Sequence, residues 1–421
     1  MAIAPRLQEY VMLKINGERL WTSLMNMAAV GATPAGGVRR LALTEQDAAG
    51  RALFSQWCVE AGLTMSVDKV GNLFARRAGK RNDAAPVASG SHLDTQPEGG
   101  RFDGVYGVLA ALEVVRTLND ADIQTEKPIE IVVWTNEEGA RFTPAMLGSA
   151  AFTAVMPLAQ ALNTRDASGT SVEQALQTTG YAGTRAVPGI VFDAYFEAHI
   201  EQGPVLEESG VPIGVVTGGQ AIRWLDVRVR GQAAHAGTTP MQYRRDALFA
   251  SAEMAAELER IAAEFFPLGL ATIGELQIRN ASRNTIAADL TFTVDLRHPD
   301  DALIGNMETA LRERFDAIAK RRRLTVEIGQ HWVSPATPFD PQCIAAVSNA
   351  VEALDYPHQR IISGAGHDAI HLAKHCPTAM IFIPCVDGLS HNEAEDALPE
   401  DVRRGTDVLL HAMLARAGQA A

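Results

Sequence analysis

Residues 129–138 read IEIVVWTNEE, an apolar run of strand length that ends on an amide and two carboxylates. Comparable short runs occupy residues 86–91, 194–198 and 379–384, and a helical stretch, GVYGVLAALEVVRTL, begins at Gly104. Buried strands that alternate with helices are typical of a mostly parallel sheet covered on both faces. The sequence therefore predicts the α/β fold class for this part of the chain.

The middle of the chain has a different periodicity. In residues 225–230 and 290–297, apolar and polar side chains alternate, which indicates strands with one solvent-facing side. Helical stretches occupy residues 246–265 and about 301–320. We therefore predict an inserted α+β domain over residues 216–331.

The two flanking segments, residues 1–215 and 332–421, are predicted to form one discontinuous α/β domain. A chain of 421 residues is too long for one compact core, so two domains are the expected number. No internal repeat interrupts this organisation.

Composition restricts the partners of the chain. Lys and Arg total 37 against 50 Asp and Glu, and the resulting charge of −13 repels phosphate backbones, so we expect no nucleic-acid partner. No apolar run approaches the roughly 20 residues of a membrane span, and no signal-peptide pattern begins the chain. The four cysteines are scattered, as in a protein with reduced thiols. These features predict a cytoplasmic protein without a membrane partner.

Five metal-ligating side chains lie where such a fold would collect them. His92, Glu138, His199 and His391 each follow a strand-like run, and ligands of open α/β sheets gather beyond the carboxyl ends of the strands. Asp103 lies in a glycine-rich turn just before a helix. Imidazole and carboxylate groups suit zinc, cobalt or manganese, and a carboxylate can bridge two cations.

Each of these residues also has an ordinary explanation. His92 alone would be a hydrogen-bonded loop histidine, Asp103 alone a helix cap, and Glu138 alone a solvated acid. The combination indicates a metal site more specifically than any one member does. Four of the residues follow predicted strands and Asp103 precedes a predicted helix, so all five are expected at the same edge of the sheet.

Five segments in the same order carry a family resemblance: SHLDT at Ser91, GGRFDGVYGVLAALE, TNEEGARFTPAMLGS, HIEQGPVLE and SHNEAE. They strongly resemble the dinuclear zinc hydantoinase/carbamoylase family of amidases, from about Ile15 to the C-terminal region. The family comprises N-carbamoyl-L-amino acid hydrolases, β-ureidopropionases and allantoate amidohydrolases, and it is related to co-catalytic metallopeptidases. The resemblance implies a zinc-exopeptidase-like catalytic domain with an inserted ferredoxin-like lid and dimerisation domain, hence a homodimer.

The resemblance also implies two divalent metal ions per chain, zinc in preference to manganese or cobalt. His92 and His199 would hold one ion, Glu138 and His391 the other, and Asp103 would bridge the two.

Three catalytic roles follow from the same motifs. Asp94 would orient the imidazole of His92, and Glu137 matches the general base of the family. His235, in QAAHAGTTP, would reach across the dimer interface and donate a hydrogen bond to the developing oxyanion.

The remaining matches concern a small carboxylate substrate. Gln202, Asn284, Gly366 and His367 match substrate-contacting positions, and Arg297 offers a planar fork for a carboxylate. The segments beside Asn284 lack the prolines common in the family, so we expect the local turn shape to differ there.

These expectations describe a hydrolase that cleaves the carbamoyl C–N bond of N-carbamoyl amino acids or ureidopropionate and releases amino acid, ammonia and carbon dioxide. The alternative is allantoate amidohydrolase, which needs the same groups. A dinuclear aminopeptidase is less favoured because HIEQG replaces its usual acidic ligand region. An inactive dimeric binding protein would typically have lost a ligand or the base, whereas this sequence keeps all six.

Overall fold

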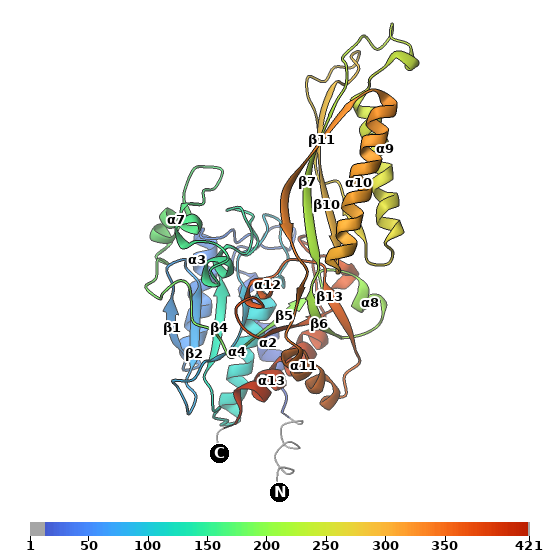
Figure 1. Cartoon of the computed structure of the whole chain (residues 1–421). Coiled ribbons are helices and arrows are strands. Elements are labelled where there is room, and N and C mark those ends of the chain that lie inside the picture. The colour runs from blue at the N-terminus through green and yellow to red at the C-terminus, as the bar shows by residue number, and fades with distance from the viewer. Residues whose placement is uncertain (1–12, 420–421) are drawn as a thin grey trace. The chain divides into compact units, whose positions relative to one another are not determined.

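The computed structural model describes residues 13–419 and divides into two compact units (Figure 1). The first unit runs to Gly218 and resumes at Pro338, and the second unit is Gly219–Thr337. The sequence predicts the insertion over residues 216–331, so the second unit begins and ends slightly later along the chain.

The first unit is built on a nine-stranded sheet of order β1-β2-β4-β3-β5-β14-β6-β12, with β13 paired to β6. Its strands are β1 Thr64–Val67, β2 Leu73–Arg77, β3 Val87–His92, β4 Ile129–Trp134, β5 Ala194–Ile200, β6 Ile213–Gly219, β12 Thr337–Pro338, β13 His358–Ser363 and β14 Thr378–Ile383.

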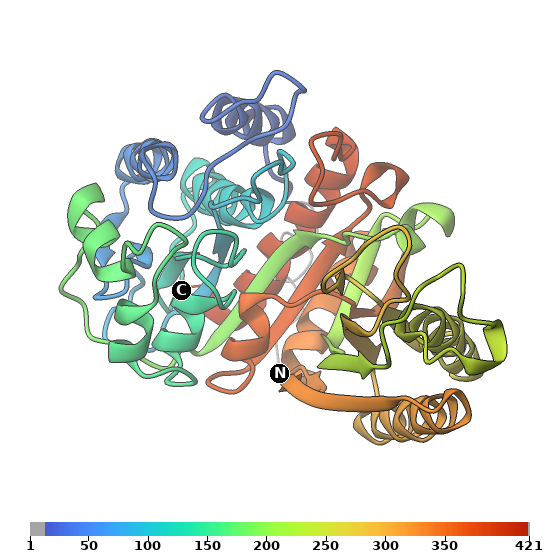
Figure 2. The same cartoon turned by 90° about the horizontal axis from the view of Figure 1, so that it is seen from above.

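The sheet confirms the predicted α/β fold class, with a parallel centre and antiparallel strands toward its edges. The four central strands β4, β3, β5 and β14 pair in parallel, whereas β1, β2 and β6 pair antiparallel with their neighbours. A short turn joins β1 to β2, and a connection of that length permits only an antiparallel pair. Every residue of the four central strands is buried, and Figure 2 shows helices on both sides of the sheet.

Helix α4, Val105–Asp120, is buried along most of its surface because it packs on β3, β4 and β5 and against α2 and α13. A helix that is apolar nearly all round is the kind that a protein interior accepts. The other helices of the unit are α2 Gly17–Ala28, α3 Glu45–Glu60, α5 Leu147–Phe152, α6 Leu158–Asn163, α7 Val172–Thr179, α8 Val205–Glu208, α11 Pro341–Ala353, α12 Asp368–Leu372, the 3-10 turn η2 Val386–Gly388 and α13 Pro399–Ala417.

The second unit has an antiparallel sheet of order β11-β7-β10-β8, with β9 also paired to β10. Its elements follow the β-α-β-β-α-β sequence of a ferredoxin-like fold when the short strands β8 and β9, which both pair with β10, are counted as one interrupted strand. They are β7 Ala221–Arg230, the 3-10 turn η1 Met241–Tyr243, α9 Ala247–Glu264, β8 Leu270–Thr272, β9 Leu276–Ile278, β10 Asp289–His298, α10 Asp301–Arg322 and β11 Thr325–Ser334.

The second unit has its own hydrophobic core. The apolar residues of β7 and β10 alternate with polar ones, and the apolar side chains pack with those of α9 and α10. Asp246 and Asp300 begin these two helices, since each side chain accepts hydrogen bonds from free backbone N–H groups of the first turn. Among residues 13–419, no helix combines the length and apolarity needed to cross a bilayer.

Candidate active site

The predicted metal-ligating residues of the first unit lie at one edge of its sheet. His92 ends β3, His199 lies one residue before the end of β5, and Glu138 follows β4. His391 lies in the loop after β14. Because β4, β3, β5 and β14 are adjacent and parallel, the loops at their carboxyl ends meet.

Asp103 reaches the same edge from the loop between β3 and α4. The next residue, Gly104, has φ +67° and lies directly against the ring of His92. A Cβ atom at Gly104 would stand 2.4 Å from the His92 ring nitrogen Nε2. Only glycine therefore lets this turn bring Asp103 so close to the histidine.

The two oxygens of Asp103 face different partners. Oδ1 lies 3.5 Å from Nε2 of His92 and 3.2 Å from Nε2 of His199. Oδ2 lies 3.4 Å from Nε2 of His391, which is 3.3 Å from Oε2 of Glu138. The five side chains thus form two groups of possible metal ligands that share Asp103.

Backbone carbonyls orient the two buried histidines. Nδ1 of His92 lies 2.8 Å from the carbonyl oxygen of Asp94, and Nδ1 of His199 lies 2.9 Å from that of Ile200. Each Nδ1 is then the protonated nitrogen in the neutral ring, which leaves the Nε2 lone pair directed at Asp103.

Asp94 differs from its predicted role in detail. Its backbone carbonyl, rather than its carboxylate, contacts His92. The carboxylate instead accepts hydrogen bonds from the backbone N–H of Glu137, at 3.3 Å, and of Glu138, at 3.2 Å. The physical reason is that Asp94 has passed the end of β3, so its side chain meets the neighbouring loop after β4.

The electrostatics of the cluster favour added positive charge. Burial acts to raise the pKa of Asp103, but hydrogen bonds from His199, His391 and His92 outweigh it and lower that pKa well below its usual range. Hydrogen bonds to Asp103 and Glu138 raise the pKa of His391 to about 10. Divalent cations would satisfy the same carboxylates in place of protons on the imidazoles.

Glu137 belongs to neither ligand group, although it is buried beside them. Its Oε2 lies 3.4 Å from Nε2 of His92. Burial raises the pKa of Glu137 well above its usual range, and the charge of His92 opposes the shift. A carboxylate that is next to the ligands, but not one of them, suits proton transfer.

Glu197, His199 and His367 form a third group of close metal-ligating side chains. The carboxylate of Glu197 already accepts hydrogen bonds from the Ser91 hydroxyl at 2.7 Å and from the Tyr195 hydroxyl at 3.1 Å. These bonds join Glu197 of β5 to Ser91 of β3 and to Tyr195, which is a structural role. The group is therefore a poor metal site.

Two predicted substrate contacts present buried polar atoms near the cluster. Gln202 donates a hydrogen bond from Nε2 to Oδ2 of Asp103 at 2.8 Å. Its Oε1, like Nε2 of His367, is buried without a hydrogen-bond partner among the described residues. The His367 ring lies 4.5 Å from that of His199, and burial lowers the pKa of His367 well below its usual range. Gly366, in the same loop, packs near the Met146 methyl group.

The predicted residues of the second unit fall into two separate places. His235 and Asn284 lie on neighbouring segments beyond Asp289, where the N–H of Ala236 donates to the Asn284 carbonyl at 2.9 Å. Arg297 lies near the other end of β10, where Nε and Nη2 donate to Asp295. At about 3.4 Å per residue, Asp289 and Arg297 are roughly 27 Å apart. A single copy of this unit therefore cannot place Asn284 and Arg297 on one small substrate.

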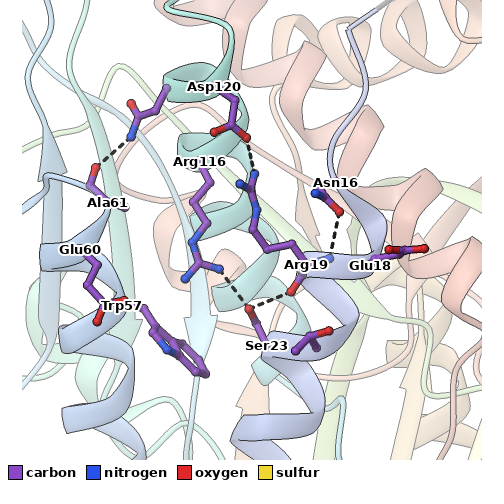
Figure 3. A pocket seen from close by; sticks show the side chains of 11 residues that line it. Asn16, Glu18, Arg19, Ser23, Trp57, Glu60, Ala61, Arg116 and Asp120 are labelled. Carbon is purple, nitrogen blue, oxygen red and sulfur yellow. Dashed lines mark hydrogen bonds and ion pairs between the residues drawn. The ribbon is translucent and has the colours of Figure 1, made fainter.

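A hollow of about 640 Å³ lies elsewhere in the first unit (Figure 3). Residues of α2, α3 and α4 line it, and it contains no predicted site residue. Arg19 pairs with Asp120 at 2.8 Å, and Arg116 donates to the Ser23 hydroxyl at 3.0 Å (Figure 3). Both arginines of the hollow are thus engaged by neighbouring side chains, which gives it no evident chemistry.

Sequence reasoning missed several contacts that hold the cluster. Gln96 donates from its backbone N–H and from Nε2 to the two oxygens of Glu138, at 3.1 and 2.7 Å. Glu395 accepts from the backbone N–H of Asp103 at 3.0 Å. The SHNEAE motif contains Glu395, but only the folded chain shows which backbone groups it reaches.

The chain is similar to known proteins over nearly its whole length. Residues 88–415 match peptidase family M20/M25/M40. A hydantoinase/carbamoylase family amidase from Burkholderia ambifaria has 67% sequence identity and a TM-score of 0.92, over 97% of this chain and 99% of that chain. An N-carbamoyl-L-amino-acid amidohydrolase of Rhizobium meliloti is 46% identical over 95% of this chain and 96% of its own. A ureidoglycolate hydrolase of Arabidopsis thaliana is 33% identical over 94% and 86%.

Proposed function

This chain belongs to peptidase family M20/M25/M40, and we propose that it hydrolyses the carbamoyl C–N bond of N-carbamoyl-L-amino acids. The observation that carries this proposal is the pair of ligand groups sharing Asp103, with Glu137 beside them. The near full-length similarity to an N-carbamoyl-L-amino-acid amidohydrolase supports the choice of reaction.

The residues fit a pair of divalent metal ions, because imidazoles and carboxylates suit zinc, cobalt or manganese, and the family resemblance favours zinc among them. His92 and His199 would hold one ion, Glu138 and His391 the other, and each oxygen of Asp103 faces one of these pairs. Such ions acidify water and polarise a substrate oxygen when bound.

Glu137 moves the proton in this proposal. Its Oε2 accepts a proton from the attacking water, and the water oxygen bonds to the carbamoyl carbon. Glu137 then delivers that proton to the amino-acid nitrogen as the C–N bond breaks. The products are the free amino acid and carbamic acid, which decomposes to ammonia and carbon dioxide.

Gln202 and His367 supply a reason for a carbamoyl group in particular. The terminal NH₂ of that group has two N–H donors, and Gln202 Oε1 and His367 Nε2 are buried atoms without partners among the described residues. Both would accept those N–H groups when the His367 ring carries its proton on Nδ1. An acetyl group would place a methyl there and leave both acceptors unpaired. Sites built for hydrogen bonding discriminate strongly against such substrates.

We further propose that the active enzyme is a homodimer in which the second unit serves as lid and dimerisation domain. Arg297 would bind the substrate carboxylate, while His235 and Asn284 would come from the partner subunit. The separation of these residues along β10 supports this division, because one copy cannot supply all three to one substrate. A cytoplasmic location remains a prediction.

Ureido acids such as ureidoglycolate or allantoate are the second candidate substrates. The ureidoglycolate hydrolase relative favours this alternative. Those substrates also combine a terminal NH₂ with a carboxylate, so the same residues would bind them.

Release of the free amino acid from N-carbamoyl compounds, N-acetyl compounds and dipeptides, and of ammonia from the ureido acids, tests the function. The zinc-loaded chain is expected to act on N-carbamoyl-L-amino acids with a kcat/KM at least about 100-fold above that for the matching N-acetyl compounds. Ureidopropionate, ureidoglycolate and allantoate test the alternatives. Faster cleavage of dipeptides or N-acetyl compounds would contradict the proposal, and so would inactivity on every ureido acid.

Subunit mixing tests the shared site. Glu137→Gln and His235→Ala are each expected to be nearly inactive as homodimers. In a mixed dimer, the centre with an intact Glu137 would receive His235 from the partner, so equal random mixing should restore about one quarter of wild-type activity. Co-expression of two differently tagged chains supplies the mixed dimer. Activity no higher than that of the homodimers would show that His235 serves its own chain.

A further inference from the structure

The loop that carries His391 is docked on the loop that carries Asp103. Residues 390–396 follow β14, and residues 99–103 follow β3. The closest link between them is the carboxylate of Glu395, which is fully buried. No role in the predicted site accounts for this acid.

Glu395 binds the backbone of the Asp103 loop directly. Its Oε1 accepts hydrogen bonds from the N–H of Phe102 at 2.9 Å and of Asp103 at 3.0 Å. Its Oε2 lies 3.0 Å from the hydroxyl of Ser390, and that hydroxyl is 3.1 Å from Oδ2 of Asp103. Glu395 therefore holds the backbone at Asp103 directly, and the Ser390 hydroxyl, next to His391, lies between the two carboxylates and can donate to either.

Gly100 shows how closely the two loops fit. A Cβ atom there would lie 2.1 Å from the carboxyl carbon and Oε1 of Glu395. Any larger residue at position 100 must therefore displace the Glu395 carboxylate from the two backbone N–H groups that donate to it. A second link, the ion pair of Arg101 with Asp396 at 2.9 Å, joins the same loops without touching a predicted ligand.

We propose that Glu395 is a positioning residue that sets the separation between Asp103 and His391, and thereby the strength of the metal site formed by Asp103, Glu138 and His391. This inference rests on the proposed metal centre. His92 and His199 are each oriented by backbone carbonyls, so two of the three ligands in their group keep their places without Glu395, and only the shared Asp103 depends on it. His391 is half-exposed and has no such carbonyl contact among those described, so its place relies on the loop.

Cobalt titration of the metal-free full-length chain tests this inference, with visible absorption reporting each binding step. Glu395→Leu removes the acceptor, and Glu395→Gln keeps an acceptor oxygen. Gly100→Ala displaces the acid without changing it. Asp396→Asn is the matched control, because it breaks the other link between the same loops.

Wild type is expected to bind cobalt in two steps. Glu395→Leu and Gly100→Ala should weaken the second step by about 10–100-fold while the first stays within about threefold. Glu395→Gln and Asp396→Asn should stay close to wild type at both steps. Circular dichroism identifies the variants that fold. If Glu395→Leu does not fold, Gly100→Ala provides the test.

Equal weakening of both steps, or an unchanged second step in a folded Glu395→Leu or Gly100→Ala chain, would overturn the positioning role. The same would follow if Asp396→Asn weakened the second step as much as Glu395→Leu. Failure of wild type to bind cobalt at all is a different outcome, since it would remove the proposed metal centre itself.

Discussion

Glu137→Gln is expected to lower kcat by at least about 1,000-fold, because an amide cannot accept the proton of the attacking water. The substitution keeps the shape of the side chain, and Glu137 lies in neither ligand group. Metal content should therefore remain at the wild-type value. Steady-state ammonia release and elemental analysis of the same purified sample measure the two quantities.

Glu138→Gln provides the contrast for this experiment. It alters the adjacent residue by the same chemical change, but Glu138 lies in a ligand group with His391. We expect it to lose bound metal together with activity. A Glu137→Gln enzyme that kept more than about one tenth of wild-type kcat would show that another group is the base.

The location of the candidate site was predictable because it depends on local patterns. Each apolar run reports a buried strand: the predicted run at residues 86–91 lies within one residue of β3, and the run that begins at residue 129 matches β4. Parallel strands carry the residues after their carboxyl ends to one edge. The same local information predicted α9 and α10 to within a few residues.

Features that depend on contacts between distant segments were not predictable from these patterns. The apolar run of an antiparallel strand is hard to distinguish from that of a parallel strand when both faces are buried, so the direction of the flanking strands was not predicted. The hydrogen bonds that the Asp94 carboxylate accepts depend on the path of the loop that follows β4. Glu395 acts on Asp103 from 292 residues away, and no spacing rule connects the two.

The separation of Asn284 from Arg297 shows a third limit. Motif matching assigns both residues to substrate binding, and their spacing along the chain does not show that they lie far apart in the fold. Only the pairing of β10 with β7 over its full length shows that the strand is straight enough to hold them apart. The structure thereby turns a pair of matched residues into a prediction about two subunits.

Asp103→Asn is expected to weaken the metal centre by more than the roughly 10–100-fold typical of losing an outer-shell partner, because Asp103 faces both ligand pairs. An asparagine can turn its oxygen to only one pair and presents N–H donors to the other. Activity should fall to that of the metal-free protein, and zinc titration by calorimetry should lose at least one binding step. Glu98→Gln is the matched control, since it makes the same charge change on an exposed residue of the same loop. Two unaltered zinc steps in a folded Asp103→Asn chain would contradict the shared-ligand arrangement.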